Sequence, residues 1–242
     1  MVNIGTALGV ILEGFWITVA VTVGGAVLAL VVSFLAGLAA LSPNPAIRGV
    51  NRVFVEFFRG TSLLVQLFWW FYVLPFLGVQ LHPIAAGIVA LGINYGAYGS
   101  EVVRGAILAV PRTQREATVA LSMTPLQRMR LVLLPQAIVG MIPPFTNLLI
   151  QLLKGSALVY LIALADLSYQ AKEYRDSTGD TFLAYGLVLV VYFLLAQAMA
   201  LGMRYWERRA KANIGQAPPP VFKRLVTVPA STAGGAGIGA QT

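Results

Sequence analysis

The chain has 242 residues, of which 58% are hydrophobic and only 11% are charged. Soluble domains carry about 25% charged residues, so this composition excludes an ordinary soluble domain and predicts a membrane protein. The sequence contains no cysteine, which excludes disulfides, thiolate metal sites and cysteine nucleophiles.

Five apolar runs each come close to the roughly 20 residues that a helix needs to cross a hydrocarbon core about 30 Å thick. They are Gly14–Leu41, Gly60–Leu81, Pro83–Ser100, Leu131–Leu153 and Thr181–Met203. The first run is too long for the apolar part of a cleavable signal peptide, and no basic residue precedes it, so we expect it to remain in the mature protein. The sequence therefore predicts an all-α transmembrane bundle of five helices.

The net charge of +8 could suit a nucleic-acid partner, but the basic residues are sorted by loop. They follow the first, third and fifth runs and are absent before the first run and between the second and third. Between the fourth and fifth runs, acidic residues outnumber them. By the positive-inside rule, this alternation predicts an amino terminus outside and a carboxyl terminus in the cytoplasm.

The second run is expected to belong to a helix that begins earlier, with Glu56 and Arg59 at its cytoplasmic end. The outer connection between the second and third runs, at Gly78–Pro83, is very short, which predicts an antiparallel pair of spans.

Polar residues recur on one face of each of two apolar runs, at helical spacings of four and three residues. These stripes are Asn94, Tyr98 and Glu101 in the third run, and Asn147, Gln151 and Lys154 in the fourth. Polar groups inside membrane helices tend to face the bundle interior or a solute pathway, so we predict one shared polar surface, with Gln66 as a weaker candidate. The alternative is that the amides only bond helices together. Glu101 is expected to pair with Arg104, one turn away.

Glycines in the third run and prolines in the fourth support a second prediction, about helix packing and helix shape. Four glycines in the third run, Gly87, Gly92, Gly96 and Gly99, favour close helix packing. In the fourth run, Pro135, Pro143 and Pro144 are expected to bend or interrupt the helix and to free backbone carbonyls.

The connection Pro111–Arg130 is predicted to form two short helices. Thr113 with Glu116, and Thr124 with Gln127, have the spacing of capping boxes, and Pro125 suits a first helical position. The connection is too apolar for a freely solvated loop, so we expect another surface to cover it.

The rest of the sequence shows no catalytic or cofactor-binding motif. Residues 211–242 are rich in Pro, Gly, Ala, Ser and Thr and are predicted to be a disordered cytoplasmic tail. The single histidine, His82, lies in a turn next to Pro83, and no phosphate-binding loop with a lysine is present. We therefore expect no enzyme activity and no cofactor in this chain.

The segment from Glu116 to Pro135 resembles the EAA loop of permeases in binding-protein-dependent ABC importers. Glu116 and Ala117 match the motif, Thr118 replaces its second alanine, and Ser122 replaces its glycine. The ending Val132-Leu133-Leu134-Pro135 matches conservatively, so Leu134 and Pro135 complete the motif.

Further segments resemble the polar amino acid branch of that family. They are Arg59-Gly60-Thr61-Ser62-Leu63-Leu64-Val65-Gln66, Ala97-Tyr98-Gly99-Ser100-Glu101-Val102-Val103-Arg104-Gly105 and Leu134-Pro135-Gln136-Ala137. Ser62 stands where the first signature has proline. Lys154-Gly155-Ser156-Ala157-Leu158 departs from its family pattern at three of five positions.

The resemblance implies a type I ABC importer permease domain at residues 1–210, in the bacterial inner membrane, with coupling helices at about 112–131. It further implies two cytoplasmic ATPase subunits that carry ATP and Mg, a second permease, an extracytoplasmic solute-binding protein, and a polar amino acid or a zwitterion such as ectoine as solute. An ion-gradient-driven carrier or channel, or a non-transporting scaffold, are the alternatives.

Overall fold

The computed structural model describes residues 4–213, and every regular element within them is helical. Most of the predicted tail, from residue 214 onward, lies outside the described residues. In chain order the elements are α1 (Ile4–Glu13), α2 (Phe15–Ala39), α3 (Pro45–Gly60), α4 (Leu63–Phe68), the π-helix η1 (Trp69–Val73), the 3-10 helix η2 (Leu74–Leu77), α5 (Pro83–Leu108), α6 (Arg112–Ala120), α7 (Pro125–Gln127), the π-helix η3 (Arg128–Leu133), α8 (Leu134–Ser156), the 3-10 helix η4 (Val159–Ile162), α9 (Leu167–Thr178) and α10 (Thr181–Asn213).

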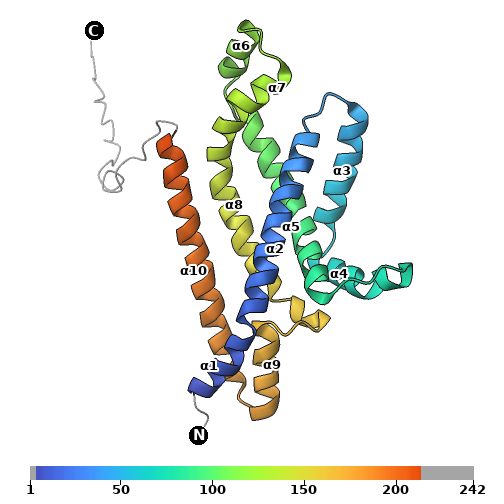
Figure 1. Ribbon diagram of the computed structural model, residues 1–242, viewed down its shortest axis with the longest axis vertical. Coiled ribbons are helices and arrows are strands. Elements are labelled where there is room, and N and C mark those ends of the chain that lie inside the picture. Colours follow the sequence, from blue (N-terminus) through green and yellow to red (C-terminus); the bar gives the residue numbers. More distant parts are fainter. Residues whose placement is uncertain (1–3, 214–242) are drawn as a thin grey trace, which may run out of the picture.

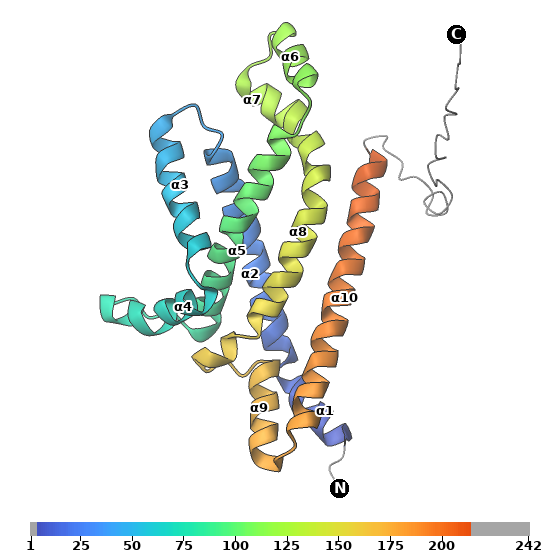
Figure 2. The ribbon, with the colours of Figure 1, turned by 180° about the vertical axis from the view of Figure 1, so that it is seen from behind.

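Two long helices, α2 and α5, form the centre of the molecule (Figure 1). Helix α8 packs beside them and α10 lies beyond α8, whereas α3 lies on the opposite side. Helices α6 and α7 form one extremity of the long axis, here called the α6 end. Helices α1 and α9 form the other, called the α9 end, and Figure 2 shows the same order from behind.

Three helical stretches in the described part of the chain are long and apolar enough to cross a membrane: Ala7–Ala39, Pro125–Ser156 and Thr181–Lys211. They contain the first, fourth and fifth predicted spans. Helix α5 is also long, at 26 residues, but its Asn, Tyr and Gly residues make it less apolar. In a membrane bundle, small and polar residues face neighbouring helices rather than lipid, and much of α5 is buried.

The second predicted span is not one straight helix. Helix α3 ends at Gly60, and the segment Leu63–Leu77 leaves it at an angle of 102°. Together, α3 and this segment pass as a fourth, broken span. Hydropathy describes how apolar a segment is and not its direction, so the apolar run concealed the break.

The glycines of α5 let it pack closely against α2, as predicted. A Cβ atom on Gly92 would lie 2.6 Å from Leu28, and one on Gly96 would lie 2.6 Å from Val32. Real Cβ atoms do not approach other atoms so closely, so these positions set the separation of the two central helices.

The prolines of the fourth run were expected to bend or interrupt the helix; α8 continues through Pro143 and Pro144, so they do not interrupt it. Each proline removes one hydrogen bond and leaves a carbonyl four residues earlier without its helical donor. Those carbonyls belong to Val139 and Gly140, and both residues line an open groove between α5 and α8. Carbonyls facing such space can be satisfied from outside the helix, which explains why the helix tolerates the pair.

Asp166 caps α9 inside the α9 end. Its side chain is fully buried and accepts a hydrogen bond from the backbone N–H of Tyr169 at 2.9 Å and one from the Tyr192 hydroxyl at 3.3 Å. Burial is the largest influence on this carboxyl group and raises its pKa to about 6, against the lowering effect of these hydrogen bonds.

Asp166→Asn is expected to stabilise the folded protein above pH 6. Because the pKa of Asp166 is higher in the folded than in the unfolded chain, the wild type loses stability as the pH rises from about 4 to about 6. Asparagine does not titrate and still caps the helix. The gain has an upper limit of about 3 kcal/mol, at 1.36 kcal/mol for each pKa unit, and disappears near pH 4.

Thermal unfolding midpoints between pH 4 and 8 would measure this difference. Asp176→Asn is the matched control, because hydrogen bonds from Arg175 and Lys172 lower the pKa of the exposed Asp176. The stability that Asp176 contributes to the wild type is therefore lost as the pH falls. This pH dependence has the opposite sign to that of Asp166. An Asp166→Asn protein less stable than wild type at pH 7 would contradict the argument.

Candidate functional site

The first candidate site is the connection 111–127 at the α6 end, here called the docking element. Two of its leucines are strongly exposed, Leu121 at 70% and Leu126 at 75%. Glu116 and Ala117 are exposed beside them, and the Glu116 carboxylate has no hydrogen-bond or ion-pair partner among the described residues. An exposed apolar surface around an unpaired charge is typical of a protein interface.

Buried polar contacts hold the docking element on the bundle. Arg115 donates a 2.6 Å hydrogen bond to the carbonyl of Ile107 at the end of α5. Thr118 is buried, and its hydroxyl donates to the carbonyl of Arg115 at 2.6 Å. Its own carbonyl accepts from the N–H of Met123 at 3.1 Å, which closes the turn after α6. Sequence reasoning used Arg115 only as one of the basic residues that indicate topology, whereas this contact ties α6 to α5.

Only one of the two predicted capping boxes is present. At Thr124 the box is confirmed, since its hydroxyl accepts from the N–H of Gln127 and the Gln127 side chain accepts from the N–H of Thr124. At Thr113 the prediction is wrong. Helix α6 already begins at Arg112, with Pro111 in the capping position, so Thr113 lies inside the first turn.

Ser122 adopts a left-handed backbone conformation with φ of 54° in the turn between α6 and α7. This conformation costs an ordinary residue about 1–2 kcal/mol and costs glycine almost nothing. The structure thus gives a physical reason for the glycine that the EAA motif has at this position.

Ser122→Gly is expected to stabilise the docking element by up to about 1 kcal/mol, because relief of backbone strain exceeds the extra entropy of glycine in the unfolded chain. Ser122→Val should destabilise it by about 1 kcal/mol or more, since a β-branched residue fits this conformation poorly. Hydrogen exchange of the amides of Ser122 and Met123 would measure both effects.

Ser62 provides the matched control, because it is exposed but has an ordinary φ of −67°. There glycine relieves no strain, so Ser62→Gly should not stabilise the protein. Equal effects of glycine at both positions would contradict a role for strain at Ser122.

Leu134 and Pro135 lie at the joint between the docking element and the bundle. Leu134 is partly buried against the core between α5 and α8, and Pro135 is exposed in the first turn of α8. Proline cannot donate to the carbonyl four residues earlier, and the six residues before α8 form the wider π-helix η3. Helices α7, η3 and α8 nevertheless continue as one helical stretch, Pro125–Ser156.

The second candidate site is the set of polar residues within the bundle. The structure separates these residues into two groups, one bonded to the end of α3 and one that stays accessible. Gln66 and Asn94 are buried, and both donate to the carbonyl of Phe58, at 2.9 and 3.1 Å. The Tyr98 hydroxyl donates to the carbonyl of Arg59 at 3.1 Å. These carbonyls are at the end of α3, where the 102° break removes their helical donors. The geometry therefore favours a structural role for Gln66 and Asn94, the alternative left open by the sequence.

The remaining pathway candidates stay accessible. Glu101 forms the predicted ion pair with Arg104 at 2.6 Å. Asn147 and Gln151 are exposed on α8, and their side chains have no hydrogen-bond partner among the described residues. Asn94 faces α3 and Asn147 does not, so the two stripes do not form one continuous polar surface.

A groove of about 840 Å³ separates α5 from α8 in the half of the bundle nearer the α6 end. Its polar side chains are Glu101, Gln114, Gln136 and Lys211. The groove thus combines amides with two charged groups, each of which is already in an ion pair, Glu101 with Arg104 and Lys211 with Glu207. Amides and charges of both signs are the groups that bind a zwitterionic solute.

A charged pocket of about 580 Å³ between α3 and α5 was missed by sequence reasoning. Its ionisable residues are Arg48, Arg52, Glu56, Arg59, Glu101 and Arg104. In the sequence, Arg48 and Arg52 served only as topology signals, and the pairing of Arg104 with Glu101 brought neither residue to α3. Their convergence depends on the packing of α3 against α5, which no local spacing predicts.

The apolar helices define an integral membrane protein, and the exposed docking element at its α6 end has the character of a protein interface. The chain belongs to the family of binding-protein-dependent transport system inner membrane components, whose sequence profile matches residues 29–212.

Similar proteins are named as permeases of amino-acid transport systems. The chain is 44% identical over 206 residues to the probable amino-acid ABC transporter permease protein y4tF of Sinorhizobium fredii, covering 83% of this chain and 87% of the relative. It is 32% identical to the glutamine transport system permease protein GlnP of Escherichia coli, covering 85% and 94%. The crystal structure of an amino acid ABC transporter with histidines superposes with a TM-score of 0.79 at 32% identity, covering 86% of this chain and 99% of that chain.

Proposed function

We propose that this chain forms part of the membrane pathway of an ATP-driven importer for a polar amino acid or a related zwitterion such as ectoine. One observation carries the proposal: a single helical stretch, Pro125–Ser156, begins at the exposed docking element and ends beside the accessible amides of Asn147 and Gln151. A partner gripping the docking element would thereby act directly on the solute pathway.

The energy source is assigned to other chains. Two cytoplasmic ABC ATPase subunits would bind ATP and Mg and contact Glu116, Ala117 and the exposed leucines of the docking element. Ser122, Leu134 and Pro135 would shape this element and join it to α8. Residues 1–210 would form the translocating domain in the inner membrane.

The solute pathway is assigned to the face that α5 and α8 leave open. Glu101, Asn147 and Gln151 are the accessible candidates there, whereas Tyr98 is turned towards α3. A second permease, identical or homologous, would close this face. An extracytoplasmic binding protein would deliver the solute. The mixed charges and amides of the groove, and the glutamine permease among the relatives, support a polar amino acid.

Transport by the purified complex in proteoliposomes would test this function. With ATP and Mg present, radiolabelled glutamine, histidine, cystine and ectoine would be supplied in turn with the binding protein. Accumulation that stops with a hydrolysis-deficient ATPase and continues in the presence of a proton uncoupler is expected. Accumulation that survives the deficient ATPase but collapses with the uncoupler would establish the gradient-driven carrier instead.

A further inference from the structure

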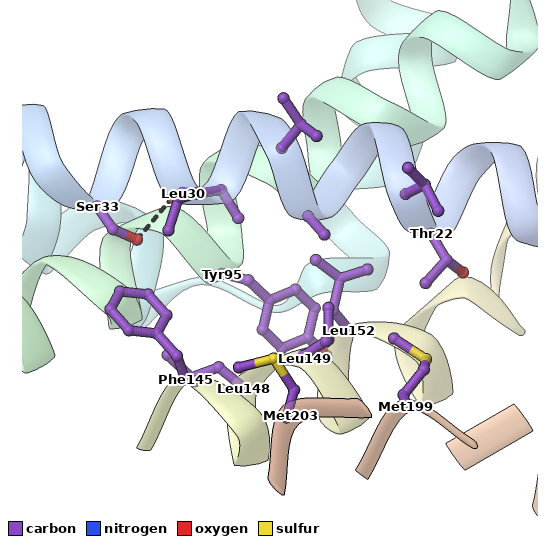
Figure 3. A pocket seen from close by; sticks show the side chains of 14 residues that line it. Thr22, Leu30, Ser33, Tyr95, Phe145, Leu148, Leu149, Leu152, Met199 and Met203 are labelled. Carbon is purple, nitrogen blue, oxygen red and sulfur yellow. Dashed lines mark hydrogen bonds between the residues drawn. The ribbon is translucent and has the colours of Figure 1, made fainter. Parts of the chain in front are cut away.

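An apolar cavity of about 400 Å³ lies between α2, α5, α8 and α10, apart from the groove and the docking element (Figure 3). Leu30 on α2 faces Phe145 and Leu149 of α8 across it, and Met199 and Met203 of α10 close one side. Its lining is almost entirely hydrocarbon and thioether, so the cavity differs chemically from any site for a polar solute.

The polar side chains that line the cavity already have partners. Thr22 donates to the Ser156 hydroxyl at 3.3 Å, Ser33 donates to the carbonyl of Ala29 at 2.6 Å, and Tyr95 donates to the carbonyl of Gln151 at 2.8 Å. A polar ligand would lose its water and gain no free donor, at a cost of about 2–7 kcal/mol for each unpaired group. The cavity therefore selects an apolar occupant.

The length of the cavity matches one leaflet of a bilayer. Its lining on α2 extends from Thr22 to Ser33, which is about 16.5 Å at a rise of 1.5 Å per residue. Half of a hydrocarbon core is about 15 Å thick. A chain lying along α2 through this cavity would thus span the acyl region of a single leaflet.

The α10 side of the cavity adjoins lipid. Very little of α10 is buried, and it lies at the margin of the bundle in both overall views (Figures 1 and 2). Beyond Met203, towards the α6 end, α10 carries the exposed aromatic residues Tyr205 and Trp206, which suit the membrane interface. The ionisable residues of that stretch are Arg204, Glu207, Arg208, Arg209 and Lys211.

The excess of positive charge lies within about 12 Å of Met203 along the helix, at 1.5 Å per residue. Glu207 is already paired with Lys211 at 2.5 Å and the Arg209 guanidinium lies over the Tyr205 ring, which leaves Arg204 and Arg208 for an anion. Basic side chains at this depth attract acidic lipid headgroups.

We propose that the cavity holds one acyl chain of an anionic phospholipid, with its headgroup at the basic end of α10. The bound chain fills the space between α10 and the α2–α8 pair and fixes α10 against the bundle. The lipid comes from the leaflet on the α6 side. This inference does not depend on the proposed transport function.

Photocrosslinking in nanodiscs would test the site on the purified full-length protein. The probe is a phosphatidylglycerol with a diazirine in its acyl chain, and labelled peptides are identified by mass spectrometry. Labelling is expected to concentrate at least about fivefold on Leu148, Leu149 and Met199 relative to Leu189 and Phe193 on the exposed surface of α10. Equal labelling of both groups would mean ordinary boundary lipid and would overturn the proposal.

Leu30→Trp and Val31→Trp form a matched pair, because each wild-type side chain is 49% exposed but only Leu30 lines the cavity. Leu30→Trp should reduce cavity labelling several-fold, and Val31→Trp should leave it unchanged; the same reduction in both would count against the site. A phosphatidylcholine probe is expected to label the cavity less than phosphatidylglycerol. Equal labelling by the two would overturn the headgroup assignment.

Discussion

Glu116→Lys is expected to reduce ATP-driven uptake by more than about tenfold while the protein remains folded. The Glu116 carboxylate is exposed on α6 without a partner in the described structure, so the substitution breaks no internal contact. At an interface with the ATPase, the reversed charge would be buried opposite groups that match a carboxylate. Losing one partner of such a pair costs about 2–5 kcal/mol, and 1.4 kcal/mol is already a factor of ten.

Uptake and ATP hydrolysis should be measured together on the reconstituted complex. Glu173→Lys is the matched control, since Glu173 is an equally unpaired, exposed glutamate on α9 at the other end of the molecule. It should transport as well as wild type. Glu116→Gln keeps the shape and removes the charge, so an intermediate loss is expected. Normal uptake by Glu116→Lys would exclude docking through this residue.

Gly14→Ala should destabilise the protein by about 3 kcal/mol, near the upper end for overpacking. Gly14 separates α1 from α2 and touches the backbone at the start of α9. An added Cβ atom would collide with the carbonyl group of Asp166 and lie 2.6 Å from the nitrogen of Leu167. These are backbone atoms at a helix start, where a side-chain rotation cannot relieve the clash. A fall in the thermal unfolding midpoint would measure the effect.

Gly9→Ala is the control for that experiment. Gly9 lies on the exposed side of α1, and nothing in the structure lies within 4 Å of an added Cβ atom. Alanine in a helix interior is favoured over glycine by about 0.5–1 kcal/mol, so this substitution should stabilise the protein slightly. A similar loss of stability for both variants would show that helix α1 tolerates no change, rather than that Gly14 is tightly packed.

Features with a strong local signal were predictable from the sequence. Helices α2, α8 and α10 follow from apolar runs, because a chain crossing hydrocarbon must satisfy its backbone within one helix. The turn at Thr124 follows from its capping box, which requires only four residues. The close packing of α5 follows from its glycines, since Gly92 and Gly96 leave one face of α5 flat, but the structure was needed to show that α2 is the partner.

Features that depend on the neighbours of a helix were not predictable. The spacing of Asn94, Tyr98 and Glu101 places them on one face of α5 but does not reveal that α3 ends beside that face. The break after Gly60 requires outside donors for the freed carbonyls, and Gln66 and Asn94 supply them. A polar residue in a membrane helix can thus serve the fold of another helix, which a single-sequence pattern cannot distinguish from a role in transport.

The helical stretch Pro125–Ser156 is continuous and can act as a single lever. Its 32 residues are about 48 Å long, and a tilt of only 5° would displace one end relative to the other by about 4 Å. No loop lies between the docking element and Asn147 to absorb such a movement. A small movement of the helix at the α6 end would therefore be transmitted to the side chains of Asn147 and Gln151.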